Sequence, residues 1–533
     1  MNNNDLVAKL WKMCDNLRDG GVSYQNYVNE LASLLFLKMT EETGQEDDLL
    51  PQGMRWADLK GKIGLDQLQF YRNMLVQLGA DEHAIVRAIF QNVNTTITNA
   101  SQLTELVTTM DELEWFDDGE KKSRDDFGDM YEGLLQKNAN ETKSGAGQYF
   151  TPRPLIETMV RLMKPQPREV IQDPAAGTAG FLIEADKYIK SQTNDLDDLD
   201  DDGQEFQMKR AFVGLELVPE TRRLALMNCL LHDIEGPEIN GEEIGGAIRL
   251  GNSLGNDGEN LPKANVMLTN PPFGSASSTN ITRTFVYPTS NKQLCFMQHI
   301  YNGLEPGGRA AVVIPDNVLF EAGVGTDIRR DLMNKCNLHT ILRLPTGIFY
   351  AAGVKTNVLF FQKGTPENPN QDKDCTTETW VYDLRTNMQT FGKRNPFTDK
   401  YLKSFEDVYG VDANGQSERT EGVYNIFGCT TEVDADSEQT TEDCRWRKFS
   451  RDYIREKGDS LDITWLKDNS ITDAANLPEP DVLATEVMTE LTEALREMNQ
   501  LMIELGATDQ AEGQVALLAE EFGLEKAQIE GSK

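Results

Sequence analysis

Four consecutive residues of this chain, Asn270-Pro271-Pro272-Phe273, combine hydrogen-bond acceptors with an aromatic ring. We call residues 270–273 the NPPF motif. Proline at 271 restricts Asn270 to extended conformations, and the two prolines leave rigidly aimed carbonyls without N–H donors. The Asn270 amide oxygen and the Pro271 carbonyl could accept hydrogen bonds from both protons of a ring-conjugated amino nitrogen, such as that of adenine. Phe273 could stack on a base rotated out of a duplex, although a tight turn remains the alternative for four residues taken alone.

A glycine-containing turn, residues 173–180 (DPAAGTAG), precedes the motif and follows a short apolar run. We call it the glycine turn. Glycines between a strand and a helix let the backbone approach a cofactor closely. After the next apolar run, Glu216 is placed to accept hydrogen bonds from ribose hydroxyls. We interpret the glycine turn and Glu216 as a site for S-adenosylmethionine. Its sulfonium is an activated methyl donor, so the amino nitrogen would need no strong base before attack. A nicotinamide-binding Rossmann unit is the rival interpretation, and the NPPF motif argues against it.

Two further segments could border the same cofactor. Residues 147–152 (GQYFTP) supply an aromatic pair and a Thr-Pro helix start that could close over its methionine end. Asn252, within residues 249–254 (RLGNSL), could meet its adenine ring. Taken alone, the first segment could equally be an ordinary loop and the second a surface turn. The predicted cofactor-binding residues are Gln148, Tyr149, Phe150, Thr151, Asp173, Ala175, Gly177, Thr178, Gly180, Phe181, Glu216 and Asn252.

The motifs lie where short apolar runs alternate with helical segments. The runs are residues 170–171, 211–217, 265–269, 309–315 and 358–362. This alternation predicts an α/β fold with a mostly parallel sheet, in which ligands bind at the carboxyl ends of strands. The NPPF motif directly follows one of the runs, as a binding site should. We predict that the acidic residues 195–205 (DLDDLDDDGQE) form a solvated loop inserted between the glycine turn and Glu216.

The rest of the chain has a different character. Apolar residues recur at helical spacing from residue 5 to about 140, whereas the chain after residue 365 is polar, with one strand expected at residues 380–384. The predicted parts are a helical N-terminal domain (1–140), a methyltransferase domain (141–365), an irregular region (366–479) and a helical tail (480–533). In the tail, a seam typical of a coiled coil is formed by Ala484, Met488, Leu491, Leu495, Met498, Met502 and Leu505. Packing of this seam on its own domain is an equal alternative.

Composition limits how such a protein could work. Lys and Arg total 52 against 87 Asp and Glu, a net charge of −35, whereas a chain that grips duplex DNA alone should carry a basic stripe. The seven cysteines have no metal-site spacing, so no metal is predicted. No apolar run is long enough for a signal peptide or a membrane span, so a cytoplasmic location is expected.

Taken in order, these motifs resemble those of DNA amino-methyltransferases, and more closely the modification subunits of type I restriction-modification systems. The resemblance extends over almost the whole chain. Its segments are LWKMCDNLRDG, NELASLLFLKMT, GQYFTP, DPAAGTAGFL, GNSL, NPPFG, LEPGGRAAVVIPDNVLFE, LPTGIFYAAGVKTNVLFF and WVYDLRTNMQTFGKRNPFT. It implies a Rossmann-like, S-adenosylmethionine-dependent domain that methylates N6 of adenine in a specific DNA sequence. The glycine turn, Glu216 and residues 148–151 would hold the cofactor, and the NPPF motif would bind the target adenine.

The resemblance also implies partners. They are double-stranded DNA with its target adenine flipped out, a specificity subunit bound by two modification subunits, and a restriction subunit in the larger complex. Because the chain has no P-loop, the motor and nuclease must lie on another chain. One departure concerns Ala179, where many relatives have glycine, and we expect the turn to accommodate the added methyl group.

Two competing hypotheses come from other classes. A protein-glutamine or RNA amino-methyltransferase could use the same pair of acceptors. A non-catalytic scaffold or acidic DNA mimic is suggested by the net charge of −35, but the NPPF motif and the glycine turn together argue against it.

Overall fold

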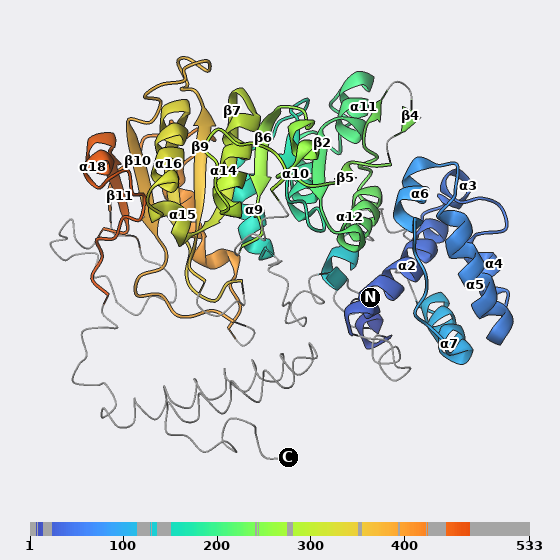
Figure 1. The fold of residues 1–533 in the computed structure, drawn as a ribbon. Coiled ribbons are helices and arrows are strands. Elements are labelled where there is room, and N and C mark those ends of the chain that lie inside the picture. The colour runs from blue at the N-terminus through green and yellow to red at the C-terminus, as the bar shows by residue number, and fades with distance from the viewer. Residues whose placement is uncertain are drawn as a thin grey trace, which may run out of the picture. The chain divides into compact units, whose positions relative to one another are not determined.

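The computed structural model describes most of the chain up to residue 468. The described residues are 7, 9–13, 24–113, 128, 130–135, 151–239, 242–243, 245–273, 281–349, 354–392, 395–422, 424 and 444–468. Their main feature is a nine-stranded sheet with helices on both faces (Figure 1).

The sheet has the strand order β11-β10-β8-β9-β7-β6-β1-β2-β5. Its strands are β1 (Ile171–Asp173), β2 (Phe212–Glu216), β5 (Ile248–Leu250), β6 (Ala264–Thr269), β7 (Leu304–Pro315), β8 (Cys336–Arg343), β9 (Thr356–Lys363), β10 (Glu378–Asp383) and β11 (Trp446–Ser450). Strands β5, β2, β1, β6 and β7 are parallel, as are β8 and β10. Strand β9 runs antiparallel to both β7 and β8, and β11 antiparallel to β10. The carboxyl ends of β6, β7, β8 and β10 and the start of β9 therefore meet at one edge.

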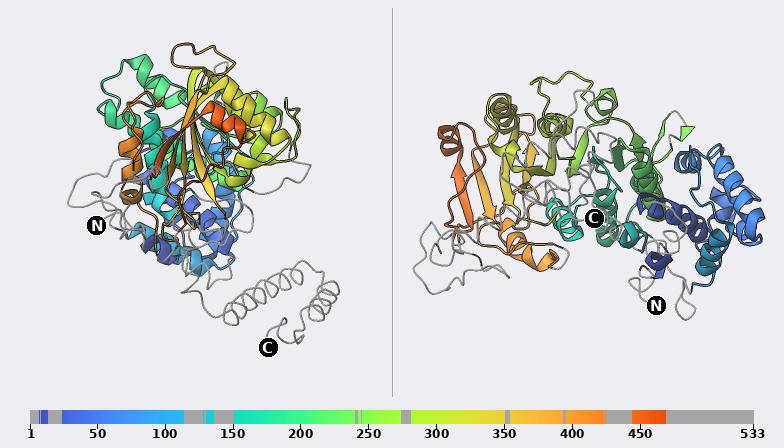
Figure 2. Two further views of the ribbon diagram at one scale, coloured as in Figure 1. Left: turned by 90° about the vertical axis from the view of Figure 1, so that its left-hand side faces the viewer. Right: turned by 60° about the horizontal axis from the view of Figure 1, so that its bottom comes forward.

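Both faces of the sheet are buried, which explains why residues 310–315 of β7 form an unbroken apolar run rather than an alternating one. On one face, Ala310 and Val312 of β7 pack in a core with α14 and α16. On the other face, Ala311 and Val313 belong to the core that contains α9, α10 and α17. These helices are α9 (Arg153–Met163), α10 (Gly180–Gln192), α14 (Lys292–Gly303), α16 (Val324–Lys335) and α17 (Lys403–Tyr409). Figure 2 (left) shows the two helical layers on either side of the sheet.

The described part of the N-terminal region is helical, because its apolar residues recur on one face of each helix. Its helices are α2 (Tyr24–Glu42), α3 (Glu46–Leu49), α4 (Trp56–Lys60), α5 (Gly64–Leu78), α6 (Ala84–Phe90) and α7 (Ala100–Asp111). In the sheet domain, α12 (Pro219–Leu231) packs against α2 and α6 as well as β2 and β5. Helix α12 therefore packs between these helices and the sheet.

The α/β prediction is confirmed, and the prediction for the acidic run was wrong in its second half. Residues from Asp201 onward form α11 (Asp201–Lys209), and the Asp200 side chain caps it by accepting the Gly203 N–H at 2.8 Å. Acidic side chains stabilise a helix N-terminus, because the unpaired N–H groups there carry partial positive charge. An acidic run can therefore begin a helix as readily as it forms a loop.

The sheet continues after residue 365, where an irregular region was expected. The strand expected at residues 380–384 is β10, and β11 pairs with it as the edge strand. Shorter elements complete the described chain: α13 (Asn256–Glu259), α15 (Asp316–Phe320), η2 (Asp399–Tyr401), α18 (Arg451–Glu456) and the β3–β4 pair (Glu238–Ile239 and Glu242–Glu243). The predicted tail seam lies outside the described residues.

Candidate active site

Asn270 follows β6 directly, at the edge of the sheet where the parallel strands end. Its Nδ2 donates a hydrogen bond to the Thr151 hydroxyl at 2.9 Å. Thr151 precedes Pro152, the N-cap of α9, so the NPPF motif is joined to one end of the predicted cofactor segment. The amide nitrogen of Asn270 thus donates to Thr151, and its amide oxygen is the atom that can accept a hydrogen bond.

The Asn270 Oδ1 atom is buried, and none of the described residues donates a hydrogen bond to it. A buried acceptor without a donor costs free energy, roughly 1–3 kcal/mol. The atom that the sequence predicted as an acceptor for an amino group therefore has no hydrogen-bond partner among the described residues.

Phe273 contributes an aromatic surface beside that acceptor. The ring is 8% exposed and meets Phe349 in a T-shaped contact, with centroids 5.8 Å apart and ring planes at 82°. Phe349 was not among the predicted site residues. It lies in the segment after β8, within LPTGIFYAAGVKTNVLFF, a stretch whose family resemblance was noted without assigning it a role.

The glycine turn leaves β1 and enters α10, and it is tied to the neighbouring strand. The Asp173 carboxylate accepts the Ala175 N–H at 2.9 Å, and the Ala176 N–H donates to the Leu215 carbonyl of β2 at 3.0 Å. Gly177 has φ +55°, and a Cβ placed there would have open space on every side within 4 Å. The turn therefore presents bare backbone to the outside of the sheet edge.

Glu216, at the end of β2, completes the turn from the other side. Its two carboxylate oxygens accept the Gly177 N–H at 3.0 Å and the Val218 N–H at 2.8 Å. Burial raises the pKa of Glu216, although these hydrogen bonds oppose the shift. Each carboxylate oxygen can accept more than one hydrogen bond, so hydroxyl donors could still be received.

Asp173 and Glu216 give this end of the sheet a buried acidic character. Burial, with the nearby charge of Glu216, raises the pKa of Asp173 to about 7. A carboxyl group whose pKa lies near 7 is uncommon away from functional sites. A positively charged ligand beside it would favour the ionised form.

The residues after β5 are connected to the glycine turn by a hydrogen bond that the sequence did not predict. The Ser253 hydroxyl donates to the Pro174 carbonyl. Next to it, the Asn252 Oδ1 accepts the Leu254 N–H at 3.0 Å, which shapes a local turn. The structure thus brings the predicted Asn252 segment against the glycine turn.

The other predicted cofactor residues divide into three groups. The Thr178 carbonyl accepts the Asn228 side chain at 3.0 Å, and Gly180 begins α10. Phe181 is 3% exposed and packs in the hydrophobic core. Gln148, Tyr149 and Phe150 lie outside the described residues, and Thr151 alone of that segment is placed, against Asn270.

Ala179 has a backbone conformation that glycine adopts more readily than alanine. Its φ is +69° and ψ is 20°, the left-handed conformation, and the residue is fully buried. An L-residue with a Cβ pays a steric cost there that glycine avoids. The turn accommodates the methyl group, but with backbone strain.

Neither a metal site nor a membrane span is found among the described residues. Their His, Cys, Asp and Glu side chains form no group of three or more that could hold a metal ion. None of the helices in the described ranges is long and apolar enough to cross a bilayer. The described cysteines are buried and form no disulfide with one another: Cys229, Cys295, Cys336, Cys375 and Cys444.

Comparison with known proteins identifies the family. The N-6 DNA methylase family model matches residues 122–437, and the model for the C-terminal domain of type I restriction enzyme methylase subunits matches residues 477–520. The type I restriction enzyme StySPI methylase subunit of Salmonella potsdam is 72% identical over 535 aligned positions, which cover 99% of this chain and 100% of that protein.

Solved structures agree. The crystal structure of the type I restriction enzyme EcoKI M protein is 66% identical, with a TM-score of 0.57 covering 97% of this chain and 99% of that one. A chain from a study of the assembly and conformational transition of the type I R-M system is 26% identical, with a TM-score of 0.65, and 95% and 98% of the two chains are covered. The chain therefore belongs to the N-6 DNA methylase family and, within it, to the methylase subunits of type I restriction enzymes.

Proposed function

We propose that the adenine-N6 methylation of this family is carried out in this chain by the NPPF motif, with S-adenosylmethionine held by the glycine turn. One observation carries the assignment: the Asn270 Oδ1 atom is buried and has no donor among the described residues. An adenine amino group would supply that missing donor. No other residue of the NPPF motif or the glycine turn has such an unpaired side-chain atom in the described structure.

The chemistry expected of Asn270 follows from its orientation. Thr151 fixes the amide by accepting from Nδ2, which leaves Oδ1 as the atom that would accept from the adenine amino group without a rotation of the amide. With the Pro271 carbonyl as a second acceptor, both amino protons are held, and the nitrogen lone pair is directed away from the ring. Preorganised acceptors of this kind favour the state in which the nitrogen becomes the nucleophile.

The two aromatic rings supply the surface for the base. Phe273 and Phe349 meet edge to face, so one ring can lie against a planar base while the other supports it from the side. Stacking on an aromatic ring offsets part of the cost of taking a base out of the duplex. We assign both rings to the base-binding site.

The glycine turn and its neighbours fit S-adenosylmethionine. Gly177 leaves open backbone, Glu216 offers carboxylate oxygens for hydroxyl donors, and Asp173 adds an acidic group suited to a cationic ligand. When bound, this cofactor supplies a methyl group on a sulfonium, so the amino group needs no strong base before attack. The remaining task of Asp173 and Glu216 is to hold and orient it.

We further propose that double-stranded DNA, a specificity subunit shared by two copies of this chain, and a restriction subunit are the partners. A net charge of −35 gives the chain alone little means of neutralising DNA phosphates. Residues 477–520, which match the family model for the C-terminal domain of these methylases, include the predicted heptad seam. That seam is our candidate contact with the specificity subunit.

Methyl transfer from labelled S-adenosylmethionine tests the function. The complex with the specificity subunit should label DNA as N6-methyladenine after digestion to nucleosides, and the isolated chain should bind cofactor but label DNA weakly. Label in protein or RNA instead would favour the other amino-methyltransferase hypotheses.

Deletion of residues 480–533 tests the assignment of the tail. Cofactor binding should be unchanged, whereas co-purification with the specificity subunit and methylation of DNA should both decline. Full assembly by the truncated chain would mean that other residues form the contact.

A further inference from the structure

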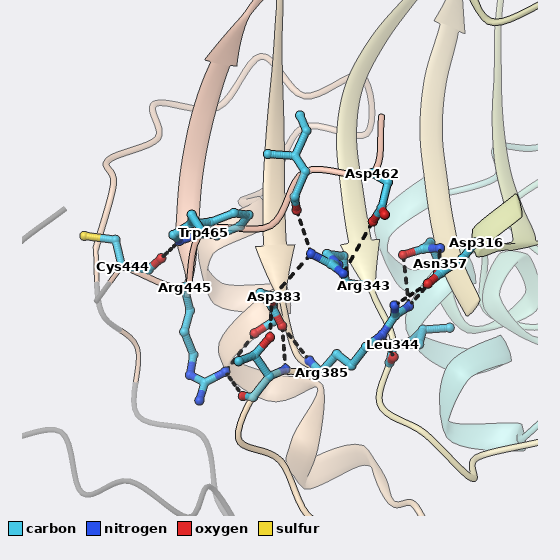
Figure 3. Close-up of polar contacts among 12 residues, drawn as sticks. Asp316, Arg343, Leu344, Asn357, Asp383, Arg385, Cys444, Arg445, Asp462 and Trp465 are labelled. Atoms are coloured by element: carbon cyan, nitrogen blue, oxygen red, sulfur yellow. Dashed lines mark hydrogen bonds and ion pairs between the residues drawn. The ribbon is translucent and has the colours of Figure 1, made fainter. Parts of the chain in front are cut away.

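Arg385 lies just beyond β10, at the edge of the sheet where the NPPF motif lies, and its guanidinium joins several strand ends (Figure 3). Its Nη1 and Nη2 donate to the two carboxylate oxygens of Asp316 at 2.8 and 3.0 Å. The Asn357 Nδ2 donates to the same carboxylate at 2.7 Å. Asp316 follows β7 and Asn357 lies in β9, so one cluster connects the ends of β7, β9 and β10.

The same guanidinium also contacts the two ends of the segment between β8 and β9 (residues 344–355, of which 344–349 and 354–355 are described), which we call the β8–β9 segment. Arg385 Nε donates to the Leu344 carbonyl at 2.9 Å, and Nη2 donates to the Thr356 carbonyl at 2.6 Å. The Leu344 N–H donates to that same Thr356 carbonyl at 3.0 Å. One side chain therefore binds the first residue of the segment and the residue that directly follows it.

The β8–β9 segment carries Phe349, whose ring meets Phe273. The segment is supported from the chain after Arg385, since the Phe391 N–H donates to the Thr346 carbonyl at 3.1 Å. Gly347 has φ +85°, and a Cβ there would stand 2.0 Å from the Phe391 carbonyl oxygen. The approach is thus too close for any other residue at 347, and Gly347 lets the described part of the segment lie against the Phe391 backbone.

The cluster is buried and charged, which makes its geometry specific. The side chains of Arg385 and Asp316 are 8% and 18% exposed. Burial alone would raise the pKa of Asp316, but hydrogen bonds and charge from Arg385 outweigh it and hold the pKa below its ordinary value. A bidentate pair of this kind needs the planar fork of arginine, which lysine cannot reproduce.

We propose that Arg385 is a positioning residue for methyl transfer: by closing both ends of the β8–β9 segment, it places Phe349 against Phe273 and so shapes the base-binding site. The inference rests on the proposed function of the NPPF motif and adds a residue that follows β10, four strands from β6 in the sheet. The hydrogen bonds of Arg385 reach the ends of the segment rather than the Phe rings, so its effect is exerted through the segment.

The test measures the rate of methyl transfer by this chain assembled with its specificity subunit. The substrate is unmethylated DNA, prepared from cells that lack the complex. Arg385→Lys keeps the charge but loses the fork, and kcat should fall by about 10- to 100-fold, the size expected from a small misplacement of a reacting group. Affinity for S-adenosylmethionine should stay within about twofold of wild type, since the glycine turn is not touched.

A double variant separates positioning from a general loss of structure. Phe349→Ala should also lower kcat, and the Arg385→Lys, Phe349→Ala double variant should fall little below Phe349→Ala alone, because both changes act through one ring. If the two losses multiply, Arg385 does not act through Phe349 and the proposal is overturned.

Arg309, in the middle of β7, provides a matched control. It forms the same kind of pair, with Nη1 and Nη2 donating to Glu169 at 2.6 and 2.8 Å, and its Nε donates to the Met163 carbonyl at 2.7 Å. Arg309→Lys should lower the melting temperature by a similar amount and leave kcat unchanged. An equal loss of kcat in Arg309→Lys would show that both act only through stability.

Two more variants keep the result decisive. Should Arg385→Lys not fold, Asp316→Asn removes the charge from the other partner with little change of shape, and it should lower kcat in the same way. Normal turnover by Asn270→Ala would overturn the proposed function itself. A loss in Asn270→Ala with normal turnover in Arg385→Lys and Asp316→Asn would overturn only the role of Arg385.

Discussion

The glycine turn and the NPPF motif stand at ends of neighbouring strands, yet they treat their polar groups in opposite ways. At the turn and the adjoining end of β2, the Asp173 and Glu216 carboxylates already accept backbone N–H groups from Ala175, Gly177 and Val218. In the motif, the amide oxygen of Asn270 is buried with no donor among the described residues.

This difference indicates which half of the site forms on its own. A turn whose N–H groups are already paired with the Asp173 and Glu216 carboxylates forms when the chain folds, and a ligand is added to it. An open buried acceptor lowers stability until a donor arrives, so it favours ligands that bring an N–H group and rejects those that do not. Selectivity for the amino group should therefore reside in the motif, and affinity for the cofactor in the turn.

The largest effect should come from Gly177→Asp in the glycine turn. The substitution puts a side chain and a negative charge on the open backbone at φ +55°. We expect S-adenosylmethionine binding to fall below detection by calorimetry, and methylation with it. Gly458→Asp is the matched control, because Gly458 also has a positive φ (+70°) and open space, but lies beyond α18. Unchanged affinity in Gly177→Asp would place the cofactor elsewhere.

Asn270→Ala should leave cofactor binding intact and lower kcat on the order of 10²-fold, the usual cost of losing a preorganised polar contact. The free protein should lose little stability, since the loss of the hydrogen bond to Thr151 is offset by removal of a buried acceptor without a donor. Thr151→Ala, which removes only the partner that orients the amide, should cost less activity. Methylation rates, calorimetry and urea unfolding measure the three quantities. Near-normal turnover in Asn270→Ala would erase the contrast between the two regions.

Cofactor affinity should rise with pH through about 7, because burial raises the pKa of Asp173 to about 7. Below that pH the carboxyl is protonated, and a cationic ligand that favours the ionised form must displace a proton. The loss approaches tenfold per unit of pH below the pKa. Calorimetry at pH 6 and 8 measures the change, and Asp173→Asn should abolish the pH dependence. An affinity that is flat in wild type would separate Asp173 from the cofactor.

Folding stability should respond to the same carboxyl with the opposite sign. The folded state holds its proton more tightly than the unfolded chain, so the contribution of Asp173 to stability is largest below the ordinary pKa of 3.8 and declines as the pH rises to about 7. Asp173→Asn should weaken this decline in urea unfolding measured between pH 4 and 8.

The smallest effect concerns strain in the glycine turn. Ala179→Gly should stabilise the protein by up to about 1 kcal/mol, because glycine adopts a φ of +69° without the steric cost of a Cβ. Ala185→Gly, in the middle of α10, should destabilise it by at least about 0.5–1 kcal/mol. Thermal unfolding of the two variants makes the comparison. If both substitutions destabilise, Ala179 carries no strain.

The placement of the candidate motifs at strand ends could be predicted because the motifs are local. A strand was expected at residues 265–269, and β6 is Ala264–Thr269, so the position of Asn270 at a strand end followed from an apolar run and two prolines. The glycine turn likewise lies between β1 and α10. Less could be predicted after residue 365, where β10 and β11 extend the sheet. A short edge strand such as β11 depends on its neighbour rather than on its own pattern.

The sequence by itself determined the α/β class, the two motifs and the residue types that could hold an amino group and a cofactor, since these depend on spacing and backbone restriction within a few residues. Only the tertiary structure decided that Thr151 would orient Asn270, that Phe349 would meet Phe273, and that Arg385 would close the β8–β9 segment. Those contacts join residues far apart in the chain. The contacts of Phe349 and Arg385 also depend on β9 running antiparallel between β7 and β8, which brings its first residues to the edge where the parallel strands end.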